Sequence, residues 1–416
     1  MSASYTNPKE TTCRISGEKM EVIIDFGEMP LGNGFLGLAD TPQEYFYSMK
    51  TGFCEESKMF QLLEQPAPEK MFHAEYAFYS STSRHMQDHF GAFADWVIAS
   101  DYLSSKDPFV VELGCNDGIL IKNFAARGIR HIGVEPSKNV AAEAQKHGVR
   151  TISEFFGAAL AEKILKTDGP ADVFLAANVM CHIPDILGVA QGINNLLKPR
   201  GVLIFEDPYL GSMVEKASYD QIYDEHVFLF SAHSIQYLFG KVGMELIDLL
   251  PQKTHGGSMR YVLAKKGIFP PTPAVGQLMA KEKLQGLDRP GGFTDFRRRV
   301  EKSKLDLVAL LRELKKQGKK VAGYAATSKS TTILNYCKIG PDLVEYICDT
   351  TPIKQGKFSP GMHIPIQPYE YFEKNPPDFA ILFAWNHSEE IMANEKEYMA
   401  RGGRWITHVP EVRVIT

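Results

Sequence analysis

Short apolar runs that end in polar residues alternate with helical stretches through the middle of this chain, and this alternation constrains its fold most. The four runs are FVVEL (109–113), HIGVE (131–135), VFLAAN (173–178) and VLIFE (202–206). Strands separated by helices are typical of a parallel sheet whose crossover helices cover its faces. The pattern therefore predicts an α/β domain in the centre of the chain.

A second alternation of the same kind follows a long amphipathic helix, which we predict over about 294–317. Its apolar runs are KKVAGYAA (319–326), VEYICD (344–349) and FAILFAWN (379–386). The segment 267–292 begins and ends in Pro and Gly, so we interpret it as a linker. Glycine, proline and short apolar pieces before residue 71 indicate a small irregular lobe. We predict domains over 1–70, 71–266 and 267–416.

The composition excludes several classes of protein. The chain has 416 residues, enough for two or three domains, and its net charge of −4 argues against broad nucleic-acid binding. It has neither a run of about 18 apolar residues nor the apolar segment of a signal peptide. Six cysteines are too few for a disulfide framework. We expect a cytoplasmic enzyme that binds neither nucleic acid nor membranes.

The loop after the first predicted strand is a candidate nucleoside site. Glu112, Gly114 and Gly118 form the pattern E-x-G-x-x-x-G between a strand and a helix. Glu135 ends the next strand, where a carboxylate can accept both ribose hydroxyls. Asn116 stands where a dinucleotide fingerprint has its second glycine, and the third glycine is absent. The pattern favours a ligand with a ribose and an ammonium group but no phosphate, which is S-adenosylmethionine (SAM).

Residues that follow other strands complete the expected SAM site. Asn178 ends the third strand, and the carboxyl ends of parallel strands meet at one edge of a sheet. We add Pro136 and Phe155 to the cofactor-binding candidates. The alternative is a strand–turn–helix whose glycines are purely structural.

Two segments beyond strand ends concentrate titratable side chains. One, at 178–185, contains His182, and the other is YDQIYDEH (219–226). In the second segment Tyr223, Glu225 and His226 could supply an oxyanion donor, an orienting carboxylate and a general base. The alternative is that His226 is a hydrogen-bonded structural histidine.

Several long motifs resemble one enzyme family, the C-methyltransferases that act on nucleotide-linked 4-keto-deoxyhexoses. YDQIYDEH, Phe230-Ser231 and THGGSMR (254–260) carry the resemblance. It extends over nearly the whole chain through PLGNGFL (30–36), FHAEY (72–76), SSTS (80–83), GYAATSK (323–329), NY (335–336), DTTPIKQG (349–356) and AWN (384–386).

The resemblance implies an α/β fold with a small N-terminal lobe, a central Rossmann-like SAM domain and a C-terminal Rossmann-like domain. Members of the family methylate C3 of a sugar whose C4 is a ketone, through an enolate, in deoxysugar biosynthesis. By similarity His226 is the general base, and Tyr223 and Glu225 adjust its proton affinity. His182 and Tyr76 would line the pocket and stabilise enolate charge. Methyl transfer itself requires no metal.

The C-terminal domain of this family helps to hold the nucleotide sugar. The resemblance implies that Lys329 and Lys354 bind the diphosphate. The other substrate-binding candidates are His255, Asn335, Trp385 and Asn386. The nucleotide is left open between dTDP and GDP, and a monomer is favoured because three lobes around one cleft can work alone.

The chain departs from the family in its N-terminal lobe, where two C-x-x-C pairs typically bind zinc. The pairs read Cys13-Arg14-Ile15-Ser16 and Cys54-Glu55-Glu56-Ser57, so each lacks one thiol. A serine hydroxyl is not deprotonated near neutrality and is a poor zinc ligand. We predict a lobe that folds without zinc; a site rescued by a neighbouring Asp, Glu or His is the alternative.

Two other functions compete with C-methylation. A methyltransferase acting on nitrogen or oxygen of a sugar would need no base able to form a carbanion, and the block from Tyr223 to His226 favours carbon. The second alternative is a non-catalytic protein that binds sugar nucleotides, and the loss of one thiol from each C-x-x-C pair is consistent with it. The retained Glu112, Glu135 and His226 argue against it.

Overall fold

The computed structural model describes residues 12–67, 71, 81, 83–103 and 106–415. Its centre is a seven-stranded sheet in the order β10-β11-β8-β7-β4-β5-β6. The strands are β4 (Phe109–Leu113), β5 (Arg130–Val134), β6 (Thr151–Ile152), β7 (Ala171–Ala177), β8 (Leu197–Pro208), β10 (Met244–Gln252) and β11 (Ser258–Lys265). β4 to β8 are parallel, and β11 and β10 extend the sheet antiparallel. The predicted α/β class is confirmed.

Helices cover this sheet as the crossover pattern requires. They are α2 (Arg84–Ile98), α3 (Lys122–Ala125), α4 (Lys138–Lys146), α5 (Ala158–Asp168), α6 (Ile186–Leu196), α7 (Leu210–Lys216) and α8 (Ala232–Gly240). β4 lies between β5 and β7, so the strand order reverses there. Ligands of open α/β sheets bind outside the carboxyl ends of the strands at such a point.

The N-terminal lobe is a regular antiparallel sheet, so the expectation of an irregular lobe was wrong. Its strands are β1 (Glu21–Pro30), β2 (Phe46–Cys54), β3 (Met59–Leu62) and β9 (Phe228–Leu229). Register shifts in β1 break the period-two alternation from which a strand is recognised. β9 comes from the chain just after the predicted catalytic segment, so the lobe's sheet also fixes that segment.

The C-terminal part of the chain forms a six-stranded sheet in the order β14-β13-β12-β15-β16-β17, parallel except for β17. Its strands are β12 (Val321–Tyr324), β13 (Ile347–Cys348), β14 (Ile366–Gln367), β15 (Phe379–Leu382), β16 (Arg404–Thr407) and β17 (Arg413–Ile415). Helices α11 (Ser328–Cys337), α12 (Tyr369–Lys374), α13 (Ser388–Asn394) and α14 (Lys396–Ala400) accompany it. The predicted Rossmann-like alternation is present.

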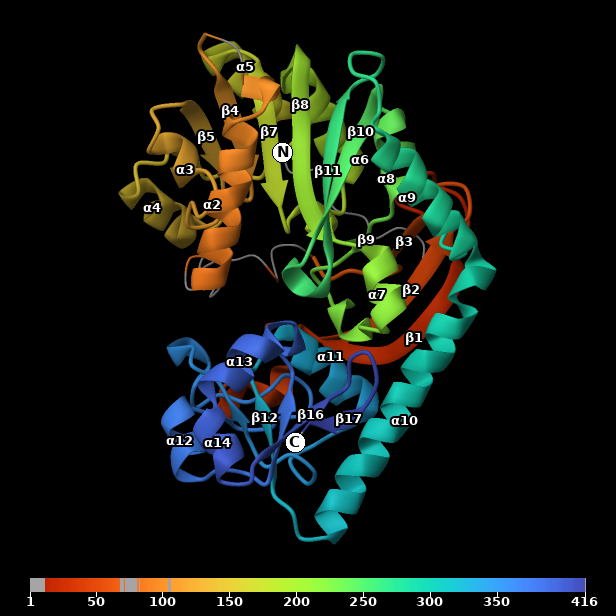
Figure 1. The fold of residues 1–416 in the computed structure, drawn as a ribbon, viewed down its shortest axis with the longest axis vertical. Coiled ribbons are helices and arrows are strands. Elements are labelled where there is room, and N and C mark those ends of the chain that lie inside the picture. The colour runs from red at the N-terminus through yellow and green to blue at the C-terminus, as the bar shows by residue number, and fades with distance from the viewer. Residues whose placement is uncertain (1–11, 68–70, 72–80, 82, 104–105, 416) are drawn as a thin grey trace.

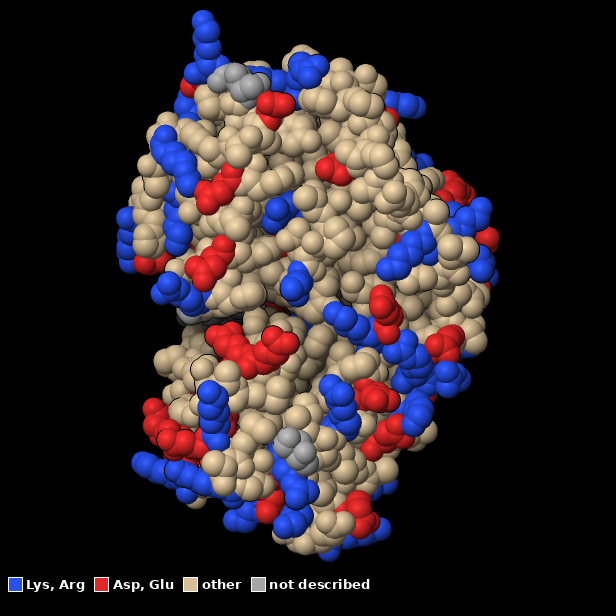
Figure 2. Space-filling view, viewed as in Figure 1, with Lys and Arg blue, Asp and Glu red and all other residues tan. Residues whose placement is uncertain are grey.

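Figure 1 shows how the parts are arranged. The central sheet forms the upper half and the C-terminal sheet the lower half, and β1 and β2 curve beside the junction. The long helix α10 (Thr294–Lys316), predicted over about 294–317, runs from beside β1 and β2 down one side of the C-terminal half. Its buried face consists of Phe296, Val300, Ser303, Leu307, Leu311 and Leu314. Figure 2 shows the surface hollowed between the two halves.

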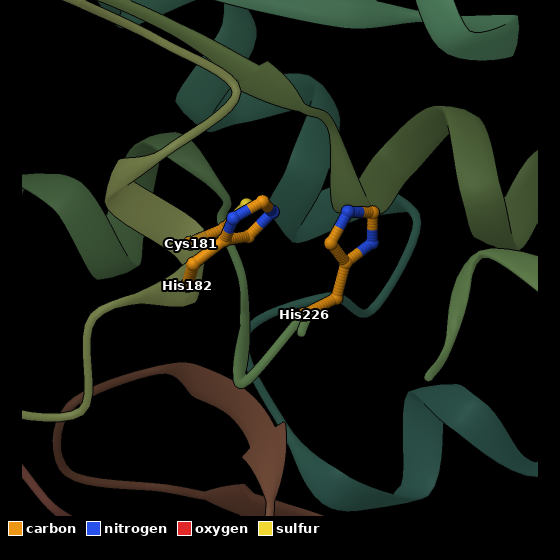
Figure 3. A group of neighbouring side chains, drawn as sticks. All are labelled: Cys181, His182 and His226. Carbon is orange, nitrogen blue, oxygen red and sulfur yellow. The ribbon is translucent and has the colours of Figure 1, made fainter. Parts of the chain in front are cut away.

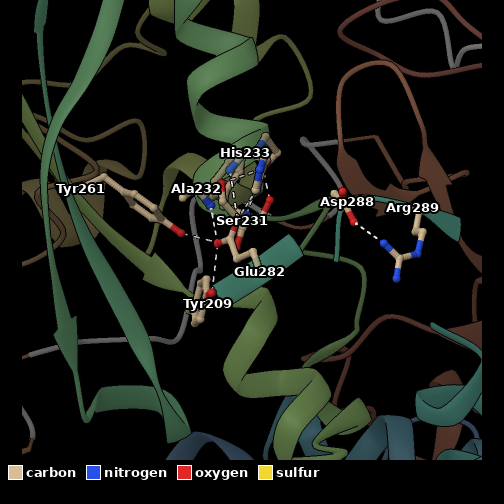
Figure 4. Close-up of polar contacts among 10 residues, drawn as sticks. Tyr209, Ser231, Ala232, His233, Tyr261, Glu282, Asp288 and Arg289 are labelled. Carbon is tan, nitrogen blue, oxygen red and sulfur yellow. Dashed lines mark hydrogen bonds and ion pairs between the residues drawn. The ribbon is translucent and has the colours of Figure 1, made fainter. Parts of the chain in front are cut away.

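The segment interpreted as a linker contains a helix, α9 (Pro273–Leu284), and that interpretation was wrong over these residues. Glu282 on α9 is fully buried and accepts hydrogen bonds from the Ala232 amide at 2.7 Å, the His233 Nδ1 at 2.7 Å and the Tyr209 hydroxyl at 3.0 Å (Figure 4). A carboxylate at the N-terminus of α8 is favourable because the amides there lack helical partners. Val275 and Glu282 are the buried residues of this helix, so one of its two buried positions is an acid and the sequence shows no clear apolar stripe there.

The described part of the chain contains no helix with the length and apolar character that a membrane span needs.

Candidate active site

The loop after β4 has a buried acid with an unused oxygen. Glu112 is 2% exposed, and its Oε2 has no hydrogen-bond partner among the described residues. Burial raises the pKa of Glu112 well above its usual value, which favours the neutral acid. Gly114 has a φ of +65°, and a Cβ there would lie 2.7 Å from the Val179 side chain. Glycine is therefore required where the loop turns.

The other cofactor candidates converge on the same edge of the sheet. Glu135 accepts hydrogen bonds from the amides of Asn116 at 3.1 Å and Ser137 at 2.9 Å, which ties the loops after β4 and β5 together. Asn178 is left-handed at φ 53°, and its buried Oδ1 has no hydrogen-bond partner within the described chain. Phe155 is 58% exposed at this edge. Orphaned polar atoms beside an exposed aromatic ring fit a nucleoside with an amino-acid tail.

Asp117 belongs to this loop and was missed in the sequence. It is 2% exposed and accepts hydrogen bonds from the Ser81 amide at 2.8 Å and the Ser81 hydroxyl at 2.9 Å. An acidic residue directly before Gly118, together with the SSTS motif, was the available signal. Asp117 thus fastens the chain before α2 over the cofactor loop.

The His226 side chain is set up as a neutral base. Its Nδ1 lies 2.7 Å from the Gln221 carbonyl oxygen, which can only accept, so Nδ1 carries the proton. Nε2 lies 2.7 Å from the Tyr223 hydroxyl and presents its lone pair to it. Burial, assisted by His182 and Lys329, lowers the pKa of His226 well below 6.5. The imidazole therefore remains unprotonated near neutral pH.

His182 lies against His226. Their rings stack at 5.2 Å between centroids, and η4 (Met180–His182) carries His182 (Figure 3). Burial lowers the pKa of His182 to about 4, so it too is neutral. Two adjacent neutral imidazoles can accept or share a proton without mutual charge repulsion.

Cys181, His182 and His226 have ligand-type atoms within 4.8 Å of one another, the distance at which a metal could be shared (Figure 3). Both nitrogens of His226 already face other partners. Burial and Asp207 raise the pKa of the Cys181 thiol well above 9, so the thiolate that a metal needs is disfavoured. The chemistry of these three side chains therefore disfavours a metal at this position.

Two carboxyls precede His226 in the chain. Asp224 and Glu225 are both buried, and burial raises the pKa of Glu225 to about 8, with Asp224 adding to the rise. Asn33 donates from Nδ2 to the Glu225 carboxyl at 2.7 Å. Gln65 donates from Nε2 to the carbonyls of His182 and Asp224, each at 3.3 Å. Asn33 and Gln65 were missed in the sequence because they lie far away along the chain.

His255 and Lys329 bring the two halves of the molecule toward this cluster. His255 lies in η6 (Thr254–Gly256) at a φ of 51°, and its buried Nε2 has no hydrogen-bond partner among the residues described. Lys329 lies in the first turn of α11, and its charge lowers the pKa of both His255 and His226. Burial lowers the pKa of Lys329, with Asp220 opposing this effect. A cation from the C-terminal half thus lies near the base.

The remaining substrate candidates have structural partners. Lys354 donates to the Ala326 carbonyl at 2.8 Å, and Asn335 donates to the Thr331 and Pro360 carbonyls at 2.9 and 3.0 Å. Trp385 donates from Nε1 to Asp220 at 2.6 Å and joins the two halves. Asn386 follows it in η9 (Trp385–His387). Pro136 is half-buried beside Glu135, and Tyr76 lies outside the described residues.

The four positions of the family's zinc site meet in the N-terminal lobe. The Cys13 thiol lies 3.2 Å from the Ser57 hydroxyl, and the Ser16 hydroxyl lies 3.3 Å from the Cys54 thiol. Burial by itself would raise the pKa of Cys54. Hydrogen bonds from Ser16, Ser57 and Cys13 outweigh this effect, so the pKa of Cys54 is lowered. Two thiols and two hydroxyls do not fit structural zinc, which takes four thiolates or thiolates with histidines. The described residues place no third Cys or His ligand there.

Comparisons with known proteins agree with this geometry. A C-methyltransferase C-terminal domain model matches residues 253–410, a methyltransferase domain model 85–249, and a zinc-binding domain model 13–72. The C-methyltransferase NovU of Streptomyces niveus is 33% identical over 97% of this chain and 96% of its own length. The chain belongs to the C-methyltransferase family of NovU. It is a SAM-dependent methyltransferase.

Other relatives resemble this C-methyltransferase only in part. A ubiquinone biosynthesis O-methyltransferase of Colwellia psychrerythraea is 29% identical over 25% of this chain and 44% of its own length. The magnesium protoporphyrin IX methyltransferase of Synechocystis, solved with bound SAM, is 16% identical over 43% of this chain and 79% of its own, with a TM-score of 0.33. Both likenesses cover less than half of this chain and do not bear on the substrate.

Proposed function

We propose that this C-methyltransferase methylates C3 of a nucleotide-linked 4-keto-6-deoxyhexose through an enolate, with His226 as the base, in deoxysugar biosynthesis. The observation that carries the proposal is the neutral His226 whose Nε2 lone pair is held toward Tyr223 at 2.7 Å. Carbon is a poor acid, and a ketone on the adjacent carbon lowers the barrier to its deprotonation. A C-methyltransferase therefore needs a base of this kind.

The proton and electron movements follow from the side chains. When the Tyr223 hydroxyl turns its hydrogen bond from Nε2 to the substrate, the Nε2 lone pair of His226 takes the C3 hydrogen as a proton, and the C–H electrons move into a C3–C4 double bond, which places negative charge on the C4 oxygen. Bound SAM supplies an electrophilic methyl group, to which the enolate carbon bonds as the sulfonium becomes a neutral thioether. The Tyr223 hydroxyl and His182 ring lie beside His226 and can stabilise the charge that develops.

The nucleotide end would lie toward the C-terminal half. Lys329 lies in the first turn of α11, where amides and the helix dipole also favour anions. This lysine makes no hydrogen bond to a described residue, so its ammonium is available to a diphosphate. Lys354 is a weaker candidate for binding the diphosphate, because its ammonium group already donates to the Ala326 carbonyl.

Solvent exchange tests the proposed reaction. dTDP- and GDP-linked 4-keto-6-deoxyhexoses are incubated with the enzyme in deuterium oxide without SAM, and deuterium at C3 is measured by NMR. We expect wash-in above the rate without enzyme, and a ¹³C-methyl group from labelled SAM should appear on carbon. A label on oxygen or nitrogen, or no labelled sugar from either nucleotide, would contradict the proposal.

The acid after β4 gives a separate prediction for the cofactor. Glu112→Gln resembles the neutral acid that burial favours, so we expect it to fold normally. The amide cannot become negative when an ammonium group binds. A charge-assisted hydrogen bond contributes about 1.5–3 kcal/mol, so SAM should bind about 10- to 100-fold more weakly by calorimetry. Adenosine lacks the ammonium group and is the control; equal weakening of both ligands would show that Glu112 does not face the amino-acid end.

A further inference from the structure

The loop 30–36 of the N-terminal lobe reaches the catalytic segment and the C-terminal half together. The Gly32 amide donates to the Asp224 carboxyl at 2.9 Å, and Asn33 donates to Glu225 at 2.7 Å. On its other side, the Gly32 carbonyl accepts from the Thr331 hydroxyl of α11 at 2.8 Å. All three parts of the chain therefore meet at two loop residues.

This approach is close and specific. A Cβ at Gly32 would lie 2.7 Å from the Asp224 carboxyl oxygen and 3.0 Å from the Ser328 Cβ, so the loop fits only without a side chain there. The catalytic segment is held from the same lobe at two more points. The Leu62 amide donates to the Val227 carbonyl at 2.8 Å, and β9 pairs with β3 directly after it.

The bond from Asn33 acts on a carboxyl in an unfavourable position. Glu225 is 5% exposed and adjoins Asp224, which is 2% exposed, so two acids share one buried site. Burial is the largest cause that raises the pKa of Glu225, and the neighbouring Asp224 is the second. The hydrogen bond from the Asn33 amide lowers this pKa. The other titratable groups that interact electrostatically with this pair are Tyr47 of β2, whose pKa Asp224 raises, and Cys181 of η4, whose pKa Glu225 raises. The hydrogen bond from Asn33 therefore favours the charged form of a carboxyl that burial and Asp224 disfavour.

We propose that Asn33 is a positioning residue for methyl transfer: its side-chain amide, delivered by the N-terminal lobe, orients the carboxyl of Glu225, the residue directly before His226. The lobe whose thiols are incomplete thus has a role in the reaction. This inference rests on the proposed function, because it assigns Glu225 to the proton chemistry at His226. An amide donor fixes which Glu225 oxygen faces the site and stabilises the charged carboxylate.

Two substitutions at position 33 test the bond. Asn33→Asp keeps the side-chain shape but replaces the donor by an oxygen, and Asn33→Ala removes the group. The Glu225 carboxyl is titrated by infrared difference spectroscopy of the complete protein, with Glu225→Gln used to assign the band. A lost hydrogen bond to a charged group should move the Glu225 titration about one to two pH units upward, and further for Asp than for Ala.

The same variants are assayed for pH dependence with dTDP- and GDP-linked 4-keto-6-deoxyhexoses. We expect the pH profile of kcat/KM to move in the same direction as the infrared titration. Thr331→Val is the matched control, because it removes the bond from the same loop to α11 and leaves Asn33 in place. It should lower the melting temperature without moving the Glu225 titration.

The outcomes separate the two proposals. If Glu225→Gln slows methylation while both Asn33 variants leave the Glu225 titration and the pH profile unchanged, the positioning role of Asn33 is wrong and the proposed function stands. If Thr331→Val moves the Glu225 titration as far as Asn33→Ala, the loop has only a structural role. If His226→Ala and Glu225→Gln both methylate carbon at the original rate, the assignment of the proton chemistry to His226 and Glu225 fails. If the native enzyme places no labelled methyl group on carbon, the proposed function itself fails, whatever Asn33 does to the carboxyl.

Discussion

Replacing His226 by alanine is expected to lower kcat for C-methylation by about 10²- to 10⁴-fold, the usual contribution of a general base. Deuterium wash-in at C3 should disappear with it, because both measurements depend on removal of the same hydrogen. SAM affinity should stay unchanged, since the hydrogen bonds of His226 go to Tyr223 and Gln221 and not to Glu112 or Glu135. His147→Ala removes an exposed histidine at the end of α4 and serves as the matched control.

The pH dependence of the rate is a second test of His226 as the base. Burial lowers the pKa of His226 well below 6.5, so the imidazole stays unprotonated as the pH falls through 6.5. The rate attributable to this base should therefore persist below pH 6.5 and decline only at the lowered pKa. An acidic limb at the pKa of a free imidazole, or wash-in that survives in His226→Ala, would contradict the assignment.

Restoring two thiols to the N-terminal lobe should create a zinc site. The thiol–hydroxyl distances of 3.2 and 3.3 Å are close to the separation of about 3.8 Å between sulfurs of a tetrahedral zinc site with bonds of about 2.3 Å. We expect Ser16→Cys/Ser57→Cys to bind one zinc per chain by metal analysis, whereas the native sequence purifies without stoichiometric zinc. At free zinc about 1,000 times Kd, the free energy of unfolding should rise by about 4 kcal/mol.

A third substitution controls this experiment. Cys13→Ser in the same background leaves three thiols and should lose most of the zinc-dependent stabilisation. A chelator should lower the melting temperature of the double variant and leave that of the native sequence unchanged. Stoichiometric zinc in the native protein, or no zinc in the double variant, would show that the four positions are not arranged as these distances indicate.

The sequence determined the fold class because its information is local. FVVEL at 109–113 coincides with β4, and the long helix predicted over about 294–317 is α10. The E-x-G-x-x-x-G pattern predicted the cofactor's edge of the sheet, since strand ends and glycines are set by neighbours in the chain. The domain limits at 70 and 266, and the role of each predicted substrate residue, stay predictions.

Tertiary structure decided the features that depend on distant residues. Asn33 and Glu225 are 192 positions apart, and nothing near either one indicates that they share a hydrogen bond. Glu282 likewise holds α9 through the end of α8, a contact about 50 positions back along the chain. The sequence by itself therefore determined the two α/β sheets, the glycine-containing loop after β4 and the missing thiols, each a property of a short segment. Only the folded chain decided which acid is neutral and which nitrogen of His226 carries the proton, because burial and hydrogen bonds set those states.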